Sequence, residues 1–249
     1  MRKKFKTAEI SIAKHPINPL ASVNLLKKEF RKNRVLSIPD FFRKPVAEGI
    51  YEFFNEQMAE DWWHLHTNPP HPDQTSVRKF PYHEPFFREE YDRIAKLTDA
   101  GTEHFTSYYW RTYHKGHGEG CACVQCRLEP VFEHESMLEL LHDVTGIKVK
   151  KAYVGASWFA PGCFLTTHCD TANGKLGIVY NMTKNWQIYF GGNLHFVEQD
   201  DWDKVLSLHV PKFNNLIVFD VSDHRNNHFV SQVAQGISQK RLAFSGWYD

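Results

Sequence analysis

The last part of the chain, from Lys150 to Asp249, consists of short apolar segments separated by turns, and this pattern constrains the fold most strongly. The segments are KKAYVGASWFA, FLTTHCD, LGIVYNMT, GNLHFVE, KVLSLHV, NNLIVFDV, HFVSQVA and RLAFSGWYD. Their length and their β-branched and aromatic content are typical of β-strands. A regular series of such strands predicts a β-sandwich or barrel of the jelly-roll type.

The first half of the chain has a different texture. In SVNLLKKEFRKNRVLSIPDFF and KPVAEGIYEFFNEQMAEDWW the apolar residues recur three and four apart, which predicts amphipathic helices with RVLSIP as a short strand between them. HLHTNPPHPDQTSVRKFPYHEP is polar and proline-rich, so we expect an irregular surface segment. ESMLELLHDVTG predicts a helix that ends at Gly146.

These patterns predict an α+β protein with its helices packed outside a β core. We expect a largely helical region with irregular loops over residues 1–148 and a catalytic core over residues 149–249. With 249 residues, 42% of them hydrophobic, the two parts are expected to form one structural unit around a full core.

Charge and cysteine content limit the class of protein. Lys and Arg number 30 against 29 acidic residues, so we expect no nucleic-acid or membrane partner. MRKKFK is not followed by an apolar segment, and no apolar run is long enough to span a membrane. The five cysteines are an odd number and three are crowded together, which favours reduced thiols in a soluble, cytoplasmic protein.

The sequence TTHCD contains the first candidate metal ligands. In a strand, residues two apart leave the same face, so His168 and Asp170 point together and offer an imidazole and a carboxylate to one ion. The same spacing in HPD, His71 to Asp73, lies in a proline-interrupted loop and is treated as a coincidence.

A third ligand is expected from another strand, and NNHFVSQV supplies His228, with His195 and His224 as alternatives. Two histidines and one carboxylate on one face of iron(II) leave positions open for a chelating co-substrate and oxygen. A lone histidine in a barrel is more commonly a hydrogen-bonded structural residue, so the assignment depends on further features.

The last strand, RLAFSGWYD, carries one such feature. Alternation places Arg241, Ala243, Ser245 and Trp247 on one face. A buried arginine requires an anionic partner, and the far carboxylate of a dicarboxylate co-substrate provides one through a bidentate contact. Ser245 can donate a hydrogen bond to the same group.

The ordered set H-x-D, YNMTKNW, GG, PKFNNLIVFDVSDHRNNH and RLAFSGWY resembles the iron(II)/2-oxoglutarate-dependent dioxygenases, in the prolyl-4-hydroxylase-like branch. The resemblance covers Ala152 to Asp249. It implies a cupin-like double-stranded β-helix in which His168, Asp170 and His228 bind iron. It also implies that Arg241 pairs with the C5 carboxylate of 2-oxoglutarate, and that oxygen hydroxylates an unactivated carbon of an amino-acid, peptide or protein substrate, releasing succinate and CO2.

The chain departs from the family pattern at Asn181, which stands where this branch usually has a co-substrate tyrosine; an amide can also hydrogen-bond a carboxylate. A register slip by one residue would make Lys240 a rival of Arg241. Two other functions remain open: an oxygenase that desaturates or demethylates another small molecule, and a non-catalytic metal-binding barrel.

YHKGHGEGCACVQC contains a second cluster of potential ligands: His114, His117, Cys121, Cys123 and Cys126. These ligands suffice for a tetrahedral zinc, although their spacing is not that of a standard zinc finger. The glycines of this segment also suit a reduced, mobile lid over an active site, which is our preferred interpretation. Redox-active thiols are the third alternative.

Overall fold

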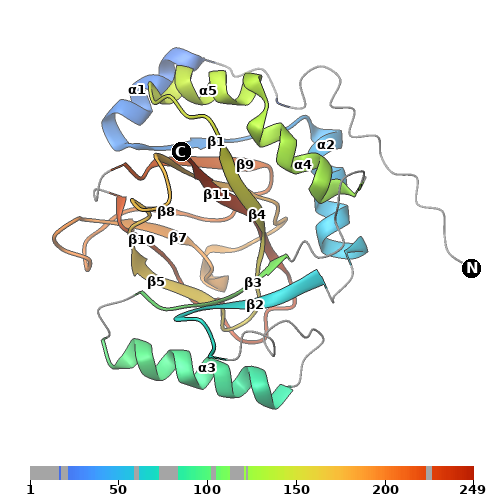
Figure 1. Ribbon diagram of the computed structural model, residues 1–249, viewed down its shortest axis with the longest axis vertical. Coiled ribbons are helices and arrows are strands. Elements are labelled where there is room, and N and C mark those ends of the chain that lie inside the picture. The colour runs from blue at the N-terminus through green and yellow to red at the C-terminus, as the bar shows by residue number, and fades with distance from the viewer. Residues whose placement is uncertain are drawn as a thin grey trace, which may run out of the picture.

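The strands of the protein form one curled, antiparallel sheet. The computed structural model describes residues 17, 22–58, 62–72, 84–101, 105–112, 121, 123–222 and 226–249. Its eleven strands are β1 (Val35–Ile38), β2 (Trp63–Asn68), β3 (Ser107–Thr112), β4 (Ala152–Phe159), β5 (Phe164–His168), β6 (Leu176–Asn181), β7 (Leu194–Val197), β8 (Val205–His209), β9 (Asn215–Asp220), β10 (His228–Val230) and β11 (Arg241–Tyr248). Their order is β1-β9-β6-β11-β4-β3-β5-β10-β7-β8, with β2 paired to β3 (Figure 1).

The sheet folds back on itself. Strands from distant places in the order, such as β9, β11, β5 and β7, contribute side chains to one cavity, so its concave face encloses a space. This arrangement is the predicted α+β class with a jelly-roll core, and the predicted C-terminal strands are present.

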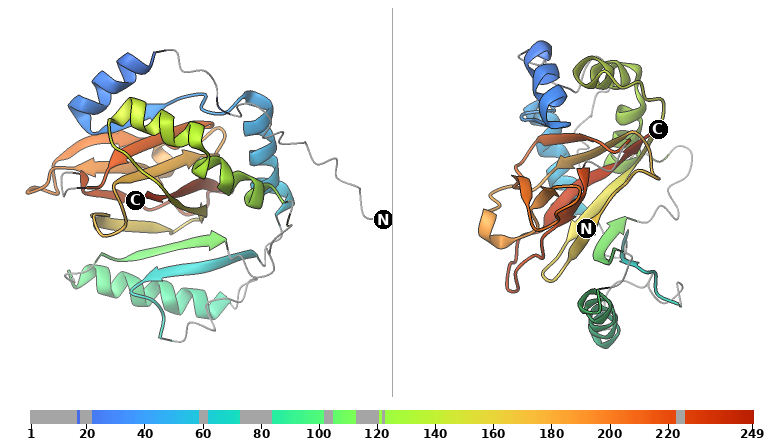
Figure 2. Two further views of the ribbon diagram at one scale, coloured as in Figure 1. Left: turned by 45° about the horizontal axis from the view of Figure 1, so that its top comes forward. Right: turned by 90° about the vertical axis from the view of Figure 1, so that its left-hand side faces the viewer.

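Helices cover the outside of the sheet (Figures 1 and 2). They are α1 (Val23–Asn33), α2 (Lys44–Glu52) continued by a π-helical turn (Phe53–Gln57), α3 (Glu84–Asp99), α4 (Val124–Glu133) and α5 (Glu135–Thr145), besides a 3-10 turn (Ile188–Phe190). Ser22 caps α1 by accepting a hydrogen bond from the Leu25 amide, and Gly146 ends α5 in the left-handed conformation as predicted. None of the helices in the described part of the chain is both long and apolar enough to cross a membrane.

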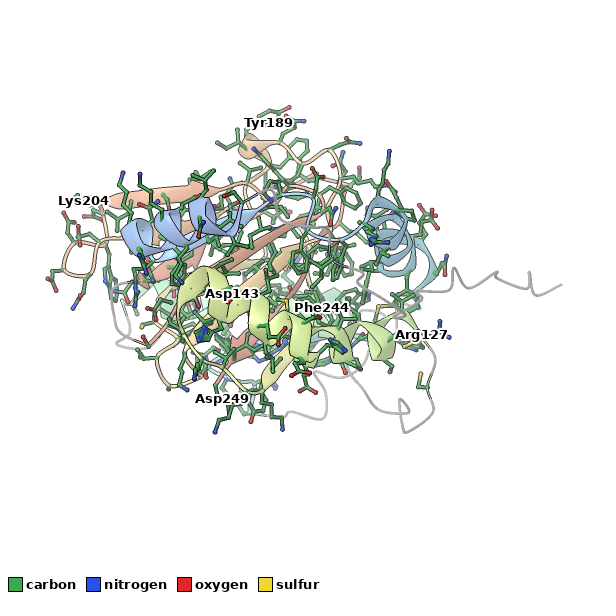
Figure 3. The ribbon with its side chains drawn as sticks, turned by 90° about the horizontal axis from the view of Figure 1, so that it is seen from above. Arg127, Asp143, Tyr189, Lys204, Phe244 and Asp249 are labelled. Atoms are coloured by element: carbon green, nitrogen blue, oxygen red, sulfur yellow. The ribbon has the colours of Figure 1, made fainter. Side chains whose placement is uncertain are left out.

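β11 separates the helical layer from the cavity. Leu242, Phe244 and Tyr248 are completely buried on its convex side. Phe132 of α4 stacks on Phe244 with ring centroids 5.2 Å apart, and Figure 3 shows Phe244 beside the helical layer. The alternating residues of β11, beginning with Arg241, therefore leave the concave face.

Two elements of the first half correct the sequence interpretation. The segment predicted to be irregular begins with β2, in which Trp63, Leu65 and Thr67 are buried and the residues between them are partly exposed. The polar side chains and the prolines that follow obscure this alternation in the sequence. β3 was not predicted either, and it pairs with β4 and β5 at the cavity.

Candidate active site

The predicted histidine–aspartate pair lies where β5 ends. His168 is the last residue of β5, and Asp170 follows in the turn. Their side chains are buried, with only 9% of His168 and 5% of Asp170 exposed. Burying a carboxylate is costly unless a cation or hydrogen-bond donors compensate it, so this pair requires partners.

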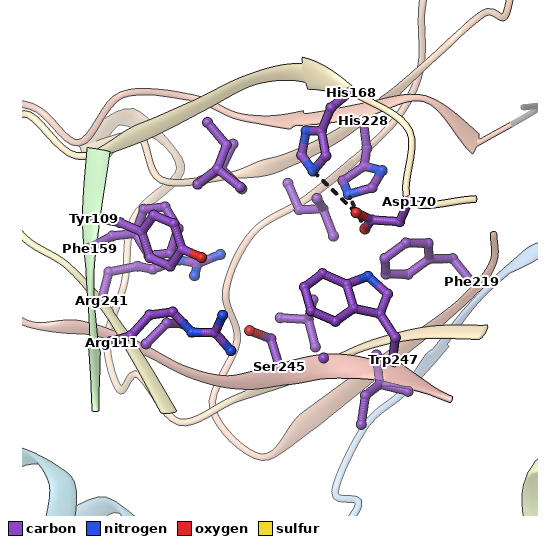
Figure 4. Close-up of a pocket in the computed structure, with 17 residues that line it drawn as sticks. Tyr109, Arg111, Phe159, His168, Asp170, Phe219, His228, Arg241, Ser245 and Trp247 are labelled. Atoms are coloured by element: carbon purple, nitrogen blue, oxygen red, sulfur yellow. Dashed lines mark ion pairs between the residues drawn. The ribbon is translucent and has the colours of Figure 1, made fainter. Parts of the chain in front are cut away.

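His228 completes the set from the neighbouring strand. It is the direct cross-strand partner of His168, and the centroids of the two rings lie 4.3 Å apart. Asp170 Oδ2 lies 3.3 Å from Nε2 of His228, and Oδ1 lies 3.8 Å from Nε2 of His168 (Figure 4). Because the potential ligand atoms of the three residues all lie within 4.8 Å of one another, they can share one metal ion.

Both histidines are oriented through their other ring nitrogen. Nδ1 of His168 lies 2.9 Å from the Thr166 carbonyl oxygen, and Nδ1 of His228 lies 2.9 Å from that of Asn226. A carbonyl oxygen can only accept, so each Nδ1 carries the proton and each Nε2 presents a lone pair to the shared point. This is the usual support of metal-binding histidines, and the donor set fits iron(II).

The protonation states also suit a metal ion. Burial, together with the nearby His228, lowers the pKa of His168 to about 4, so this ring is neutral at pH 7. Burial opposes ionisation of Asp170, but its interactions with His228 outweigh this effect and hold the carboxyl pKa well below its usual range. Asn173 donates a further hydrogen bond to Asp170, with a nitrogen–oxygen distance of 3.0 Å.

Arg241 lies at another side of the same cavity and is only 3% exposed. Its Nε donates to the Gly192 carbonyl oxygen at 3.1 Å, and its guanidinium carbon lies 4.4 Å from the centre of the Phe159 ring. No carboxylate of the described residues forms an ion pair with it, and burial lowers its pKa to about 10. A buried arginine in this state is suited to bind an anion.

The register of β11 directs Lys240 away from the cavity. Lys240 Nζ donates to the Asn55 carbonyl oxygen at 2.7 Å and lies 5.7 Å from the ring centre of Trp158. Arg241 pairs with Phe159 of β4, which lines the cavity. Adjacent strand residues point to opposite faces, so the cavity receives Arg241 and not Lys240.

The other predicted contact residues are divided between the cavity and its surroundings. Ser245 and Trp247 line the cavity with Arg241, and Trp247 lies beside Asp170 (Figure 4). Asn181 is 1% exposed and pairs with Ala243, which places it on the same sheet face, but it does not line the cavity itself. Neither polar atom of the Asn181 side chain has a hydrogen-bond partner among the described residues.

Two cavity residues were missed by the sequence interpretation. Tyr109 and Arg111 project from β3 into the cavity, and the Tyr109 ring stacks on Phe159 with centroids 5.1 Å apart. Alternation in SYYWRT places both residues on one face, which was the available signal. β3 lies far from the recognised motifs in sequence, so only its pairing with β4 shows that this face is the cavity.

The sequence from residue 154 to 249 matches the family model of the 2OG-Fe(II) oxygenase superfamily. Over this segment the chain is a 2OG-Fe(II) oxygenase. The segment includes the three clustered residues and Arg241, and membership implies iron(II) and 2-oxoglutarate as cofactor and co-substrate. The match over these residues therefore indicates a 2-oxoglutarate-dependent dioxygenase.

Solved structures extend the similarity in fold beyond this segment. A prolyl-4-hydroxylase from Pseudomonas putida matches with a TM-score of 0.50 and 12% identity, covering 91% of this chain and 98% of that one. A Trichoplax adhaerens prolyl hydroxylase, in complex with a hypoxia inducible factor peptide fragment, gives 0.51 and 14% over 91% and 88%. A Burkholderia pseudomallei 2OG-Fe(II) oxygenase family protein gives 0.53 and 12% over 92% and 91%.

At 12–14% identity these structural matches show a shared fold alone, and that fold is the predicted double-stranded β-helix. A search of curated protein sequences finds no significant match.

The cysteine cluster of the oxygenase is partly described. The sulfur atoms of Cys121, Cys123 and Cys126 all lie within 4.8 Å of one another at the start of α4. Burial and the neighbouring thiols raise the pKa of Cys126 to about 12. His114 and His117 lie outside the described residues, so zinc binding by all five residues, one of the three alternatives, remains without support.

His71 of the HPD pair contacts residues of α3. His71 Nε2 is 3.8 Å from a carboxylate oxygen of Glu90 in α3, and its ring contacts Phe86. Asp73 lies outside the described residues. His195, an alternative third ligand, pairs with Phe229, next to His228 in β10, and therefore leaves the opposite face of the sheet. His224, the other alternative, is not described.

Proposed function

We propose that the oxygenase hydroxylates an unactivated carbon in an amino-acid side chain, with the amino acid free or within a peptide or protein. His168, Asp170 and His228 hold iron(II), and Arg241 binds the C5 carboxylate of 2-oxoglutarate. When bound, these cofactors and oxygen supply the oxidising chemistry, which converts 2-oxoglutarate to succinate and CO2 and inserts one oxygen atom into a C–H bond.

The residues of the chain orient the reactants and shield them. The protonated Nδ1 atoms keep both histidines aimed at the metal position, and Asp170 supplies the negative charge. Ser245 lies on the same strand face as Arg241, and its hydroxyl group donates a hydrogen bond to the C5 carboxylate. Asn181 offers a further donor, and Trp247 holds its indole beside Asp170.

One observation carries the proposal. Arg241 is buried in the same cavity as the candidate metal ligands, and no carboxylate of the described residues forms an ion pair with it. A structural metal site does not require such a cation, because the metal is satisfied by its own ligands. A dicarboxylate that binds both the metal and the arginine does require it.

Two observations support the type of reaction and substrate. Asp170 retains the carboxylate of the H-x-D motif, which favours hydroxylation over halogenation, because halogenases of this class bind a halide in its place. The Trichoplax adhaerens structure of similar fold is a prolyl hydroxylase in complex with a peptide fragment, which supports an amino-acid side chain as the target.

The test is an anaerobic incubation of the full chain with iron(II) and 2-oxoglutarate, followed by oxygen and a panel of peptides and free amino acids. We expect succinate to form and one substrate to gain the mass of one oxygen atom. A product that has lost two hydrogen atoms would instead identify a desaturase. If the protein neither binds 2-oxoglutarate nor forms succinate, the non-catalytic barrel becomes the better description.

A further inference from the structure

A second arginine, Arg111, projects into the cavity of the oxygenase. Arg111 of β3 pairs with Ser157 of β4, and both residues line the cavity together with the metal candidates and Arg241. Figure 4 shows its guanidinium group directed toward Ser245. Arg111 is partly exposed, whereas Arg241 is almost completely buried, so Arg111 is the arginine with better access from solvent.

Two titratable side chains near Arg111, those of Tyr109 and His66, are uncharged at pH 7. Gly155 of β4 lies beside the guanidinium group, since a Cβ atom at Gly155 would lie 3.6 Å from Nη2 of Arg111, an ordinary van der Waals contact. Tyr109 interacts with Arg111 from the same strand, and burial raises the pKa of this phenol. On β2, burial and the charge of Arg111 lower the pKa of His66 to about 4, so this ring is neutral at pH 7.

No carboxylate of the described residues forms an ion pair with Arg111. Among the residues that line the cavity, Asp170 is the sole carboxylate, and it belongs to the metal candidates. The cavity therefore presents two arginines that have no acidic partner among the described residues, and a guanidinium group is suited to bind a carboxylate.

Arg111 is directed toward Ser245, which also faces the C5 carboxylate of the co-substrate, and we assign that carboxylate to Arg241 because Arg241 is the more deeply buried of the two arginines. In the proposed function, 2-oxoglutarate places its C1 carboxylate at the metal and its C5 carboxylate at Arg241. The more accessible Arg111 then remains for an anionic group of the molecule that is hydroxylated. An internal residue of a polypeptide has no carboxylate on its backbone, whereas a free amino acid always has one.

We propose that Arg111 binds the α-carboxylate of the substrate and that the substrate is a free amino acid. This inference rests on the proposed function and narrows its substrate class. Tyr109 lines the cavity beside the arginine and offers its hydroxyl group to the same molecule. Arg111 thus acts as a specificity-determining residue.

The first test compares each free amino acid of the panel with its carboxamide as a stimulant of succinate release by the wild-type protein. The two compounds differ in the carboxylate and share the side chain. We expect kcat/KM for the amide of the preferred amino acid to be lower than that for the acid by a factor of about 30 or more, because the amide cannot form a charge pair with Arg111. Equal activity of acid and amide, or turnover of peptides with blocked ends only, would contradict the proposal.

The second test uses Arg111→Gln, with Lys240→Gln as a control that removes a cation on the other face of the sheet. For Arg111→Gln we expect a KM for the amino acid about 30-fold higher and an unchanged Kd for 2-oxoglutarate in anaerobic titrations. Isothermal titration of the amino acid under nitrogen should show the same loss of affinity without turnover. Arg111→Lys keeps the positive charge and should therefore retain part of the affinity for the amino acid.

The two arginines can thus be assigned separately. If Arg111→Gln weakens 2-oxoglutarate binding and leaves the amino acid unaffected, Arg111 is a co-substrate residue and the inference is wrong. Unchanged 2-oxoglutarate binding also shows that the variant is folded. A wild-type protein that does not bind 2-oxoglutarate would instead contradict the proposed function itself.

Discussion

At the scale of single residues, orientation distinguishes the candidate ligands from the other histidines. The chain has fifteen histidines, but His168 and His228 direct Nε2 toward one carboxylate while carbonyl groups hold Nδ1. His195 shows the contrast, because it stacks on Phe229 and neither of its ring nitrogens has a hydrogen-bond partner. The direction of the lone pair on Nε2 therefore identifies a metal-binding histidine better than its proximity in sequence to an aspartate does.

Removing any of the three ligands should abolish stoichiometric iron binding. We predict this result for His168→Ala, Asp170→Ala and His228→Ala, measured by metal analysis after anaerobic reconstitution, because two remaining donors hold the ion weakly. His71→Ala and Asp73→Ala are the controls and should retain iron. Iron retained by the His228 variant would place the third ligand elsewhere, and His224 would be examined next.

Arg241→Ala should retain iron but lose affinity for 2-oxoglutarate. We expect a loss of about 2–5 kcal/mol, because the far carboxylate would be buried without its partner. The measurement is an anaerobic titration of the iron(II) protein with 2-oxoglutarate, followed by the metal-to-ligand charge-transfer band. Lys240→Ala should have little effect, since Lys240 contacts Asn55 outside the cavity. A larger loss in the Lys240 variant would show that the structural register of β11 is incorrect.

At the scale of elements, the concave side of the sheet contains the chemistry and the convex side contains the core. Tyr180 donates to Asn214 and packs edge-to-face on Phe42, whereas the next residue, Asn181, leaves the opposite face. The two sides of one strand thus have different functions, and a change of one residue in register would exchange them.

The start of α4 contains the cysteine cluster, which we predict to be a reduced loop outside the iron chemistry. Replacing Cys121, Cys123 and Cys126 together with serine should leave iron-dependent succinate formation largely unchanged, because none of them lines the cavity. Any effect should be confined to the KM of the hydroxylated substrate. Metal analysis provides the check: about one equivalent of zinc, lost in the triple variant, would contradict this interpretation.

At the scale of the whole molecule, we propose that residues 1–148 and 149–249 form one structural unit. β3 pairs with β4 and β5, and β1 pairs with β9, so strands of the first part lie within the sheet of the second. The core also crosses this boundary, since Phe132 stacks on Phe244 and accepts a hydrogen bond from the Tyr248 hydroxyl at 2.7 Å.

Phe244→Ala tests this unity. We expect it to lower the free energy of unfolding by about 3–5 kcal/mol, because the change leaves a cavity between the sheet and α4. Denaturant unfolding followed by fluorescence and by circular dichroism should show one coincident transition. Tyr189→Ala, at a residue 75% exposed, should change stability little. Two separate transitions would show that the parts unfold independently.

The sequence by itself predicted the jelly-roll core, the helical cover and the oxygenase family. These predictions succeeded because local patterns carry them: apolar segments of strand length, helical spacing ended by Gly146, and the ordered motifs between Ala152 and Asp249. It also placed His168, His228 and Arg241 on strand faces, because alternation is a local property. Asp170 differs from this expectation, because β5 ends at His168 and Asp170 lies in the turn that follows.

Only the tertiary structure decided what joins those residues in space. The pairing of β5 with β10 brings His168 against His228, and the placement of β3 beside β4 adds Tyr109 and Arg111 to the same cavity. Their separation along the chain hides this proximity, because hydrogen bonding between strands depends on how the whole sheet curls. The charge of the cavity, and with it the proposed choice of substrate, is therefore a property of the fold.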